Sequence, residues 1–321
     1  MKKWLLIIVA LIITTIAMTS AGRMSGNNNL YDLKKKKMEK KIKEIDGLKM
    51  AYIEAGTGDP IVFLHGNPTS SYIWRNIIPL LEGQGRCIAP DLIGMGDSDK
   101  LPDNVPYSFE ENQKYLEKLL EKLNVKNNII FIVHDWGGAL AFDWSRRHPE
   151  AVKGIAYMES VVGPRYWNEM PMPARQLFQD LRSEKGENMV LEQNLFIEMI
   201  LPKSILREMS AEEMNQYRRP FLRPGSDRKA MLSWVRQLPI DGEPKNIVKI
   251  VNENSDFMAK STIPKLFIEA VPGTLSQDEK NICNTWSNQT KMAVKGHHHL
   301  QEDSPVEIGE AISTWIKHLN R

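Results

Sequence analysis

Short apolar runs recur along the chain from residue 44 onward, and segments with helical spacing of apolar residues separate several of them. Six runs have the length and composition of buried parallel strands, at 61–65, 87–91, 129–134, 154–159, 266–271 and 291–295. Helical patterns cover 109–123, 139–148 and 305–319. Strands that alternate with helices predict an α/β fold with a doubly wound, mostly parallel sheet.

The stretch 161–238 departs from this alternation. It is rich in Met, Arg and Glu, and prolines interrupt it repeatedly, so we expect several short helices rather than further strands. The simplest organisation is a helical cap, 161–238, inserted between the two parts of the core, 44–160 and 239–321.

The first 29 residues have the order of an export signal. Two lysines precede an apolar run that begins at Trp4, and small residues follow it, with cleavage expected after Ala21. Residues 4–22 are also long enough for a tilted membrane anchor, and the lysine run at 34–37 favours a cytoplasmic C-terminal side. From the signal-like order we expect an exported protein, periplasmic or secreted, or a membrane-anchored one rather than a cytoplasmic one. Residues 30–43 are expected to form a basic linker.

Composition and charge limit the classes of partner. Hydrophobic residues make up 42% of the 321 residues and charged residues 26%, which is typical of a globular protein and excludes a disordered chain. Without the three basic residues of 1–29, the 42 Lys and Arg fall to 39 against 40 Asp and Glu, so nothing indicates a nucleic-acid partner. Two cysteines are too few for a disulfide scaffold, and we expect both to be free buried thiols.

The run 129–134 ends at a motif that carries chemistry. Asp135 follows it, and Gly137 and Gly138 come soon after, which predicts a strand, a sharp turn and a helix with a nucleophile exposed at the turn. A helix N-cap is the alternative role for Asp135. A carboxylate that attacks saturated carbon forms an ordinary ester, which water activated by a histidine can hydrolyse. The substrate is thus expected to carry a halide or an epoxide oxygen.

A second loop supplies hydrogen-bond donors. Asn67 follows the run 61–65, where this architecture places an oxyanion hole, so its N–H and that of Trp136 are expected to face Asp135. The Asn67 amide and the Trp136 indole N–H are also donors that can hold a departing halide. A turn residue and a core aromatic are the alternatives for Asn67 and Trp136.

A histidine base and its supporting carboxylate complete the expected site. His297, His298 and His299 follow the last predicted strand, and spacing alone does not choose among them. Metal binding is disfavoured, because adjacent side chains diverge and no cysteine joins them. Glu159 and Glu269 both lie at predicted strand ends, and Glu159 is favoured because it opens the cap.

Taken together, these motifs resemble the haloalkane dehalogenases of the α/β-hydrolase superfamily. The matching stretches are 65–79, 89–100, 133–142, 157–160, 218–225, 232–240 and 296–309, and the resemblance runs from about residue 44 to the C-terminus. It implies an α/β-hydrolase fold and the hydrolysis of haloalkanes to primary alcohol, halide and proton through a covalent alkyl-aspartate ester. The implied partners are a small apolar halogenated substrate, a halide ion and water, with no cofactor and no metal.

The resemblance also implies roles for individual residues. Asp135 corresponds to the nucleophile, His298 to the base and Glu159, rather than Glu269, to the supporting acid. Asn67 and Trp136 correspond to the halide-holding donors. The positions that match the substrate cavity are Phe178, Phe196, Leu275 and Val235, the last of which is often proline in the family. His297 and His299 are unusual neighbours for the base.

Two other activities use similar sequences. An epoxide hydrolase needs two cap tyrosines, for which the cap offers only Tyr166 and Tyr217. Asn67 also stands where such enzymes usually carry an aromatic residue, which disfavours this alternative. A coelenterazine-type luciferase is the second alternative, because residues 182–191 resemble that group as well.

Overall fold

A computed structural model describes residues 38–320 of the chain. The export signal or anchor predicted over 1–29 lies outside these residues. Within the described part, no helix combines the length and the apolar character that a membrane crossing requires. Both cysteines are free and buried, as the sequence predicts.

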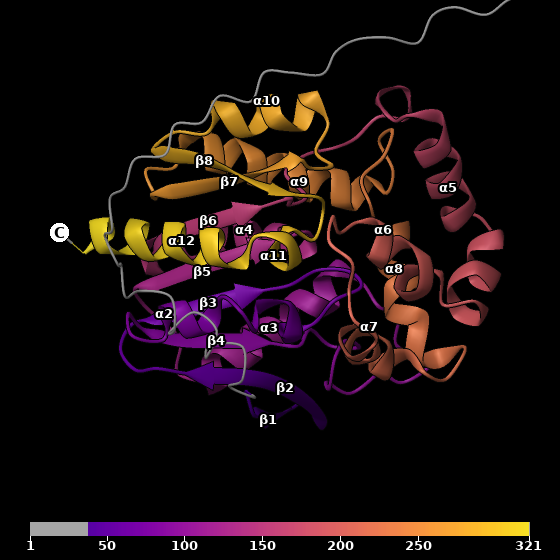
Figure 1. Ribbon diagram of the computed structural model, residues 1–321, viewed down its shortest axis with the longest axis horizontal. Helices are drawn as coiled ribbons and strands as arrows, with labels where there is room; N and C mark the ends of the chain where they lie inside the picture. The colour runs from indigo at the N-terminus through magenta and orange to yellow at the C-terminus, as the bar shows by residue number, and fades with distance from the viewer. Residues whose placement is uncertain (1–37, 321) are drawn as a thin grey trace, which may run out of the picture. The chain divides into compact units, whose positions relative to one another are not determined.

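An eight-stranded sheet lies at the centre of the described part (Figure 1). Its strand order is β1-β2-β4-β3-β5-β6-β7-β8. The strands are β1 (Lys40–Ile45), β2 (Leu48–Ala55), β3 (Pro60–Leu64), β4 (Arg86–Pro90), β5 (Ile129–His134), β6 (Val152–Met158), β7 (Lys265–Pro272) and β8 (Gln289–Gly296). Pairing is parallel from β4 through β3 to β8 and antiparallel for β1 with β2 and β2 with β4. The predicted α/β fold with a mostly parallel sheet is confirmed.

Helices cover both faces of the sheet, so its central strands are apolar on both sides. On β5, Phe131 and Val133 join the core on one face, and Ile130 and Ile132 join the core on the other. The first face packs against α3 (Phe109–Lys122), α4 (Trp136–Arg147), α9 (Lys245–Lys260) and α10 (Gln277–Thr285), and the second against α2 (Ile78–Leu81) and α12 (Pro305–Leu319).

The six predicted strands correspond to β3–β8 with end shifts of one or two residues, but the sequence patterns did not reveal β1 and β2. These two strands form a hairpin whose turn, Asp46-Gly47, has positive φ at both residues. The predicted linker over 30–43 is therefore wrong at its end, because 40–43 belong to β1. Charged lysines are tolerated there because β1 is an edge strand.

The chain between β6 and α9 forms short helices, and in Figure 1 those from α5 to α8 lie beyond the carboxyl ends of the parallel strands. We call residues 161–238 the helical segment. It contains η4 (Trp167–Glu169), α5 (Met172–Arg182), η5 (Glu187–Glu192), η6 (Phe196–Ile200), α6 (Leu201–Lys203), α7 (Ala211–Arg218), η7 (Arg219–Phe221), η8 (Ser226–Arg228) and α8 (Lys229–Arg236). The remaining short helices are η2 (Ser71–Trp74), η3 (Pro149–Ala151) and α11 (Leu300–Asp303).

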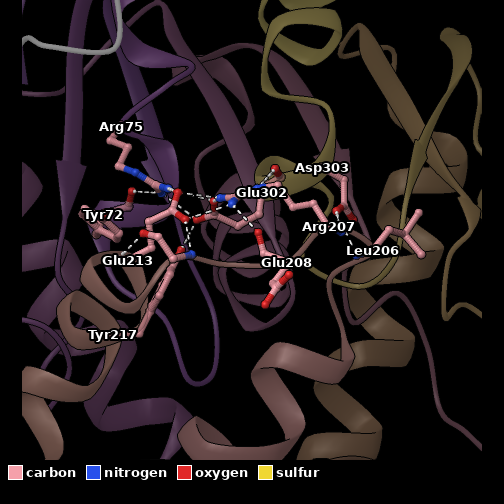
Figure 2. A network of polar contacts seen from close by, with 10 residues as sticks. Tyr72, Arg75, Leu206, Arg207, Glu208, Glu213, Tyr217, Glu302 and Asp303 are labelled. Atoms are coloured by element: carbon pink, nitrogen blue, oxygen red, sulfur yellow. Dashed lines mark hydrogen bonds and ion pairs between the residues drawn. The ribbon is translucent and has the colours of Figure 1, made fainter.

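A buried network of charged side chains joins the helical segment to two parts of the core (Figure 2). At its centre is the Glu302 carboxylate of α11, whose side chain is 0% exposed. Arg75, which follows η2, donates to its two oxygens at 2.6 and 2.8 Å. Arg207 and the Tyr217 hydroxyl, both in the helical segment, donate to the same carboxylate. Glu302 thus accepts hydrogen bonds both from the core, through Arg75, and from the helical segment.

Two further carboxylates extend this network. Glu213 accepts bonds from Arg207 at 2.7 and 2.9 Å and from Arg75 at 3.0 Å. Burial alone would raise the pKa of Glu213, but its bonds to Arg207 and Ser210 outweigh burial and lower the pKa to about 2. Asp303 accepts the N–H groups of 206 and 207 through one oxygen and that of 297 through the other. The helical segment is therefore tied to the chain at 297–303.

We expect Glu302→Gln to lower the free energy of unfolding by about 3 kcal/mol, because it leaves two arginine guanidinium groups without their buried counter-charge. Urea unfolding followed by circular dichroism measures this. Glu310→Gln, an exposed position on α12, is the matched control and should change stability by less than about 0.5 kcal/mol. Equal stability of the two variants would contradict the importance of the network.

Candidate active site

Asp135 occupies a strained turn between β5 and α4. Its backbone has φ 51° and ψ −125°, a left-handed conformation that is unfavourable for residues other than glycine. Asp135 is the N-cap residue of α4 by position, but its side chain makes no N-cap hydrogen bond, so helix capping does not account for its carboxylate. The turn instead projects the carboxylate toward the loop that contains Asn67.

Three glycines make this close approach feasible. A Cβ atom on Gly66 would lie 2.2 Å from Asp135 Oδ2, and one on Gly137 would lie 2.3 Å from the Leu64 carbonyl oxygen. On Gly138 it would lie 2.4 Å from the Ser160 side chain. Any larger residue at these positions would have to displace the turn or the carboxylate.

Backbone donors converge on the buried carboxylate. The Asn67 N–H donates to Asp135 Oδ2 at 2.8 Å, and the Trp136 N–H also bonds this carboxylate. Burial raises the pKa of Asp135, while His298 and the two N–H groups act in the opposite direction, and the net shift is upward from 3.8. The carboxylate is therefore less stabilised as an anion than an exposed one, although its donors hold it in place.

The side chains of Asn67 and Trp136 lie at the same cavity. The Asn67 amide nitrogen donates to the Met231 carbonyl at 3.3 Å, which fixes the amide group and leaves its second N–H available. The Trp136 ring packs against Trp234 with ring centroids 4.7 Å apart, and among the described residues its indole N–H has no acceptor. Both groups therefore offer donors to a molecule in the cavity.

One ring nitrogen of His298 lies toward Asp135, and the other lies toward oxygen atoms of Thr274 and Glu159. Its Nε2 lies 4.0 Å from Asp135 Oδ1, and its Nδ1 lies 3.1 Å from Thr274 Oγ1 and 3.4 Å from Glu159 Oε2. The Thr274 hydroxyl donates its own hydrogen to Glu159 and so accepts from His298 Nδ1–H. This assigns the proton to Nδ1 and leaves the Nε2 lone pair directed at Asp135.

The charges around His298 decide its pKa. Burial lowers the pKa, but the bond to Glu159 and the negative charges of Asp135 and Glu159 outweigh burial, so the net shift is upward from 6.5. Arg165 lowers it slightly. Because part of the increase comes from Asp135, the basicity of His298 depends on whether that carboxylate is charged.

Two neighbouring histidines hold the main chain of the base in position. His134 Nε2 donates to the His298 carbonyl at 2.8 Å. His299 bonds Ser204 of the helical segment twice, through its N–H at 3.0 Å and its Nδ1 at 2.6 Å. The three consecutive histidines thus have different surroundings, and of the three only His298 bonds Glu159.

The two candidate acids occupy different environments. Glu159 follows β6 with φ 43° and accepts the Thr274 N–H at 2.9 Å beside His298. Glu269 lies within β7 between Lys280 and Lys291, at 3.1 and 2.9 Å, and has no contact with His298. The structure thus brings together Asp135, His298 and Glu159 and leaves Glu269 apart.

A cavity of about 720 Å³ lies between the sheet and the helical segment. Asp135, Trp136, Asn67 and His298 all line it. So do the four positions singled out as cavity residues, Phe178, Phe196, Val235 and Leu275. Every site residue chosen from the sequence therefore lines the same cavity.

Sequence reasoning missed several contributors. Thr274, which joins Glu159 to His298, directly follows Pro272-Gly273 at the end of β7, so its place after a strand was a usable signal. Trp234, which packs on Trp136, is distant in sequence and had no such signal. The same is true of Arg165, which lines the cavity and pairs with Glu279.

Comparison with known proteins first places the fold. A family model described as the alpha/beta hydrolase fold matches residues 59–188, a range that contains Asn67, Asp135 and Glu159. The strained turn after the central strand β5 and the strand order fit an α/β-hydrolase fold.

The relatives are more specific. A haloalkane dehalogenase of Sphingobium indicum is 52% identical over 284 residues, 88% of this chain and 96% of the relative. One of Mycolicibacterium smegmatis is 48% identical over 86% of this chain and 90% of the relative. The crystal structure of a haloalkane dehalogenase of Bradyrhizobium elkani matches with a TM-score of 0.84 and 39% identity, covering 88% and 99% of the two chains. The chain belongs to the haloalkane dehalogenase family.

The charge dependence of His298 leads to a prediction. Asp135→Asn removes the negative charge opposite Nε2, so the pKa of His298 should fall relative to the wild type, in which it lies above 6.5. Titration of the imidazole signals by nuclear magnetic resonance measures both values, with the exposed His318 as internal control. An unchanged or higher pKa in the variant would show that Asp135 does not act on His298.

Proposed function

We propose that this protein hydrolyses haloalkanes to a primary alcohol, a halide ion and a proton, with Asp135 as the covalent nucleophile. The observation that carries the proposal is the arrangement around the Asp135 carboxylate: the Asn67 N–H donates to one oxygen, and His298 Nε2 lies 4.0 Å from the other. The 52% identity to a haloalkane dehalogenase supports the same reaction.

In the first step, an Asp135 oxygen attacks the carbon that carries the halogen. Oδ1 is the better candidate, because Oδ2 accepts the Asn67 N–H. A carbon–oxygen bond forms as the carbon–halogen bond breaks, and the electron pair leaves with the halide. The Asn67 amide and the Trp136 indole N–H stabilise this anion, and they do so strongly because the buried site excludes competing water.

In the second step, water attacks the carboxyl carbon of the ester. A distance of 4.0 Å between His298 Nε2 and Asp135 Oδ1 is too long for a hydrogen bond, yet one water bonded at about 2.8 Å can contact both. His298 takes a proton from this water, and the N–H groups of Asn67 and Trp136 stabilise the resulting oxyanion. The oxyanion then expels the alkoxide, which takes the proton from the His298 imidazolium and leaves as the alcohol. The regenerated Asp135 carboxyl group releases the second proton of the water to solvent. Glu159 stabilises the imidazolium.

Ester formation also prepares the base. The ester is uncharged, so it no longer contributes the negative charge through which Asp135 raises the pKa of His298. The imidazole therefore loses its proton more readily after alkylation than before it, which favours the neutral form that the second step requires.

An epoxide hydrolase is less compatible with this site. Such an enzyme needs two tyrosines that protonate the epoxide oxygen. Tyr166 lines the cavity, but the Tyr217 hydroxyl is buried and donates to Glu302 instead. The helical segment therefore offers one tyrosine to the cavity.

Removal of the base should trap the ester. With 1-bromobutane, His298→Phe is expected to release one bromide per protein and to gain the mass of one butyl group on the peptide that contains Asp135, as seen by mass spectrometry. The matched control is His297→Phe, which should release bromide repeatedly and retain no added mass. Stoichiometric bromide release by His298→Phe without a mass increase would exclude Asp135 as the covalent nucleophile in this account.

We also propose that residues 1–29 direct the protein out of the cytoplasm, by cleaved export or as an anchor over 4–22. The order of lysines, apolar run and small residues supports this. In a bacterial host, fractionation and N-terminal sequencing should give a chain that begins at Gly22 outside the cytoplasm, or an intact chain in the membrane fraction. An intact chain in the cytoplasmic fraction would contradict the proposal.

A further inference from the structure

Arg165 places a charged side chain in the wall of a cavity whose surrounding residues, such as Leu177, Leu238 and Leu275, are mostly apolar. Its side chain keeps 21% of its surface exposed. The reaction steps above do not use this residue. A guanidinium in an apolar wall is costly unless its donors are engaged, so its presence requires a physical reason.

Both the main chain and the side chain of Arg165 are fixed. Its N–H donates to the Pro239 carbonyl at 2.8 Å, and its carbonyl accepts the Asp241 N–H at 2.9 Å. Its Nε donates to Glu279 Oε1 at 2.7 Å, and the Glu279 side chain is only 2% exposed. The other Glu279 oxygen accepts the Ser276 N–H at 2.8 Å. The guanidinium is therefore held in one place before any substrate enters.

The two terminal nitrogens of Arg165 remain available. Among residues 38–320 neither Nη1 nor Nη2 has a hydrogen-bond acceptor, and neither is sealed from the space around it. Since Arg165 lines the cavity, these planar, oriented N–H groups are donors to whatever occupies it. A pure hydrocarbon chain gives them nothing to bond, whereas an oxygen atom does.

The charges that act on Arg165 itself are negative and favour a neutral acceptor over an anion, although Lys203 lines the cavity as well. Glu279 already offsets the positive charge of Arg165, and the guanidinium also feels the negative charges of Glu159 and Asp135. Glu169 lines the same cavity, and burial together with a bond to Asp278 raises its pKa. A substrate carboxylate would add negative charge to this region, while an ether, ester or hydroxyl oxygen would accept a bond without doing so.

We propose that Arg165, held on Glu279, is a hydrogen-bond subsite that makes the enzyme prefer haloalkanes with a neutral oxygen beyond the carbon under attack. The inference rests on the proposed hydrolysis of haloalkanes and specifies its substrate class. Arg165 acts here as a specificity-determining residue, because it binds a part of the substrate that does not react.

Three substrates with five chain atoms after bromine test this: 1-bromopentane, 2-bromoethyl ethyl ether and 1-bromo-3-methoxypropane. Bromide release gives kcat/KM for each, and the ratio of ether to alkane is compared between enzymes, so intrinsic reactivity cancels. Arg165→Met keeps the length of the side chain and removes its donors. Because it leaves Glu279 unpaired, Arg165→Met with Glu279→Gln is measured as well. For at least one ether, the ratio of its kcat/KM to that of 1-bromopentane should fall about tenfold in both variants. This is the effect expected when a hydrogen bond from a charged donor is lost.

The control is Arg223→Met, the same exchange at an arginine of the helical segment that is 80% exposed and paired with Asp227. It should keep the wild-type ratios. Unchanged ratios for both ethers in the two Arg165 variants, with bromide still released from 1-bromopentane, would overturn the inference and leave the proposed function intact. Absence of bromide release by the wild type from all three substrates would overturn both.

Discussion

A charged carboxylate buried at a strained turn is the constraint on which the rest of this structure depends. Asp135 sits in a left-handed conformation with its carboxylate out of bulk water, and both features are unfavourable unless the surroundings compensate for them. Glycines at 66, 137 and 138 give the turn its space, and two backbone N–H groups give the carboxylate its donors. What remains is a carboxylate that is held in place but less stabilised as an anion than it would be in water.

The same constraint explains why distant parts of the chain must be held together. Asn67 comes from the loop after β3, Asp135 and Trp136 from the turn after β5, and His298 from the loop after β8. Glu302 lies four residues beyond His298 and binds Arg75, which lies eight residues beyond Asn67, as well as Arg207 of the helical segment (Figure 2). One buried carboxylate thereby joins the chain segments that carry the base and the donors to the helices that close the cavity. A rigid scaffold of this kind fixes the short distances among Asn67, Asp135 and His298 before substrate binds.

The sequence was most informative where a local pattern decides the structure. The run that forms β5 is apolar on both faces, and the motif after it predicts a sharp turn. This strand and the position of Asp135 at its end could therefore be predicted from the sequence. Asp46-Gly47 was an equally local signal for the hairpin of β1 and β2, but the lysine run at 34–37 suggested a basic linker that extends to residue 43. The sequence favoured Glu159 over Glu269 because Glu159 precedes the helical segment. Since both residues follow or lie within neighbouring strands, it is the contact of Glu159 with His298 that distinguishes them in the structure. The pairing of Arg165 with Glu279, 114 residues apart, has no local signature at all.

The central claim is that the oxygen of the first alcohol molecule comes from Asp135. A single turnover of excess enzyme with 1-bromobutane in water labelled with oxygen-18 tests it most directly. The account predicts an unlabelled alcohol and one labelled oxygen in the peptide that contains Asp135, because water attacks the carboxyl carbon of the ester. Label in the alcohol after that first turnover, with none in Asp135, would show that water displaces the halide directly and would contradict the account.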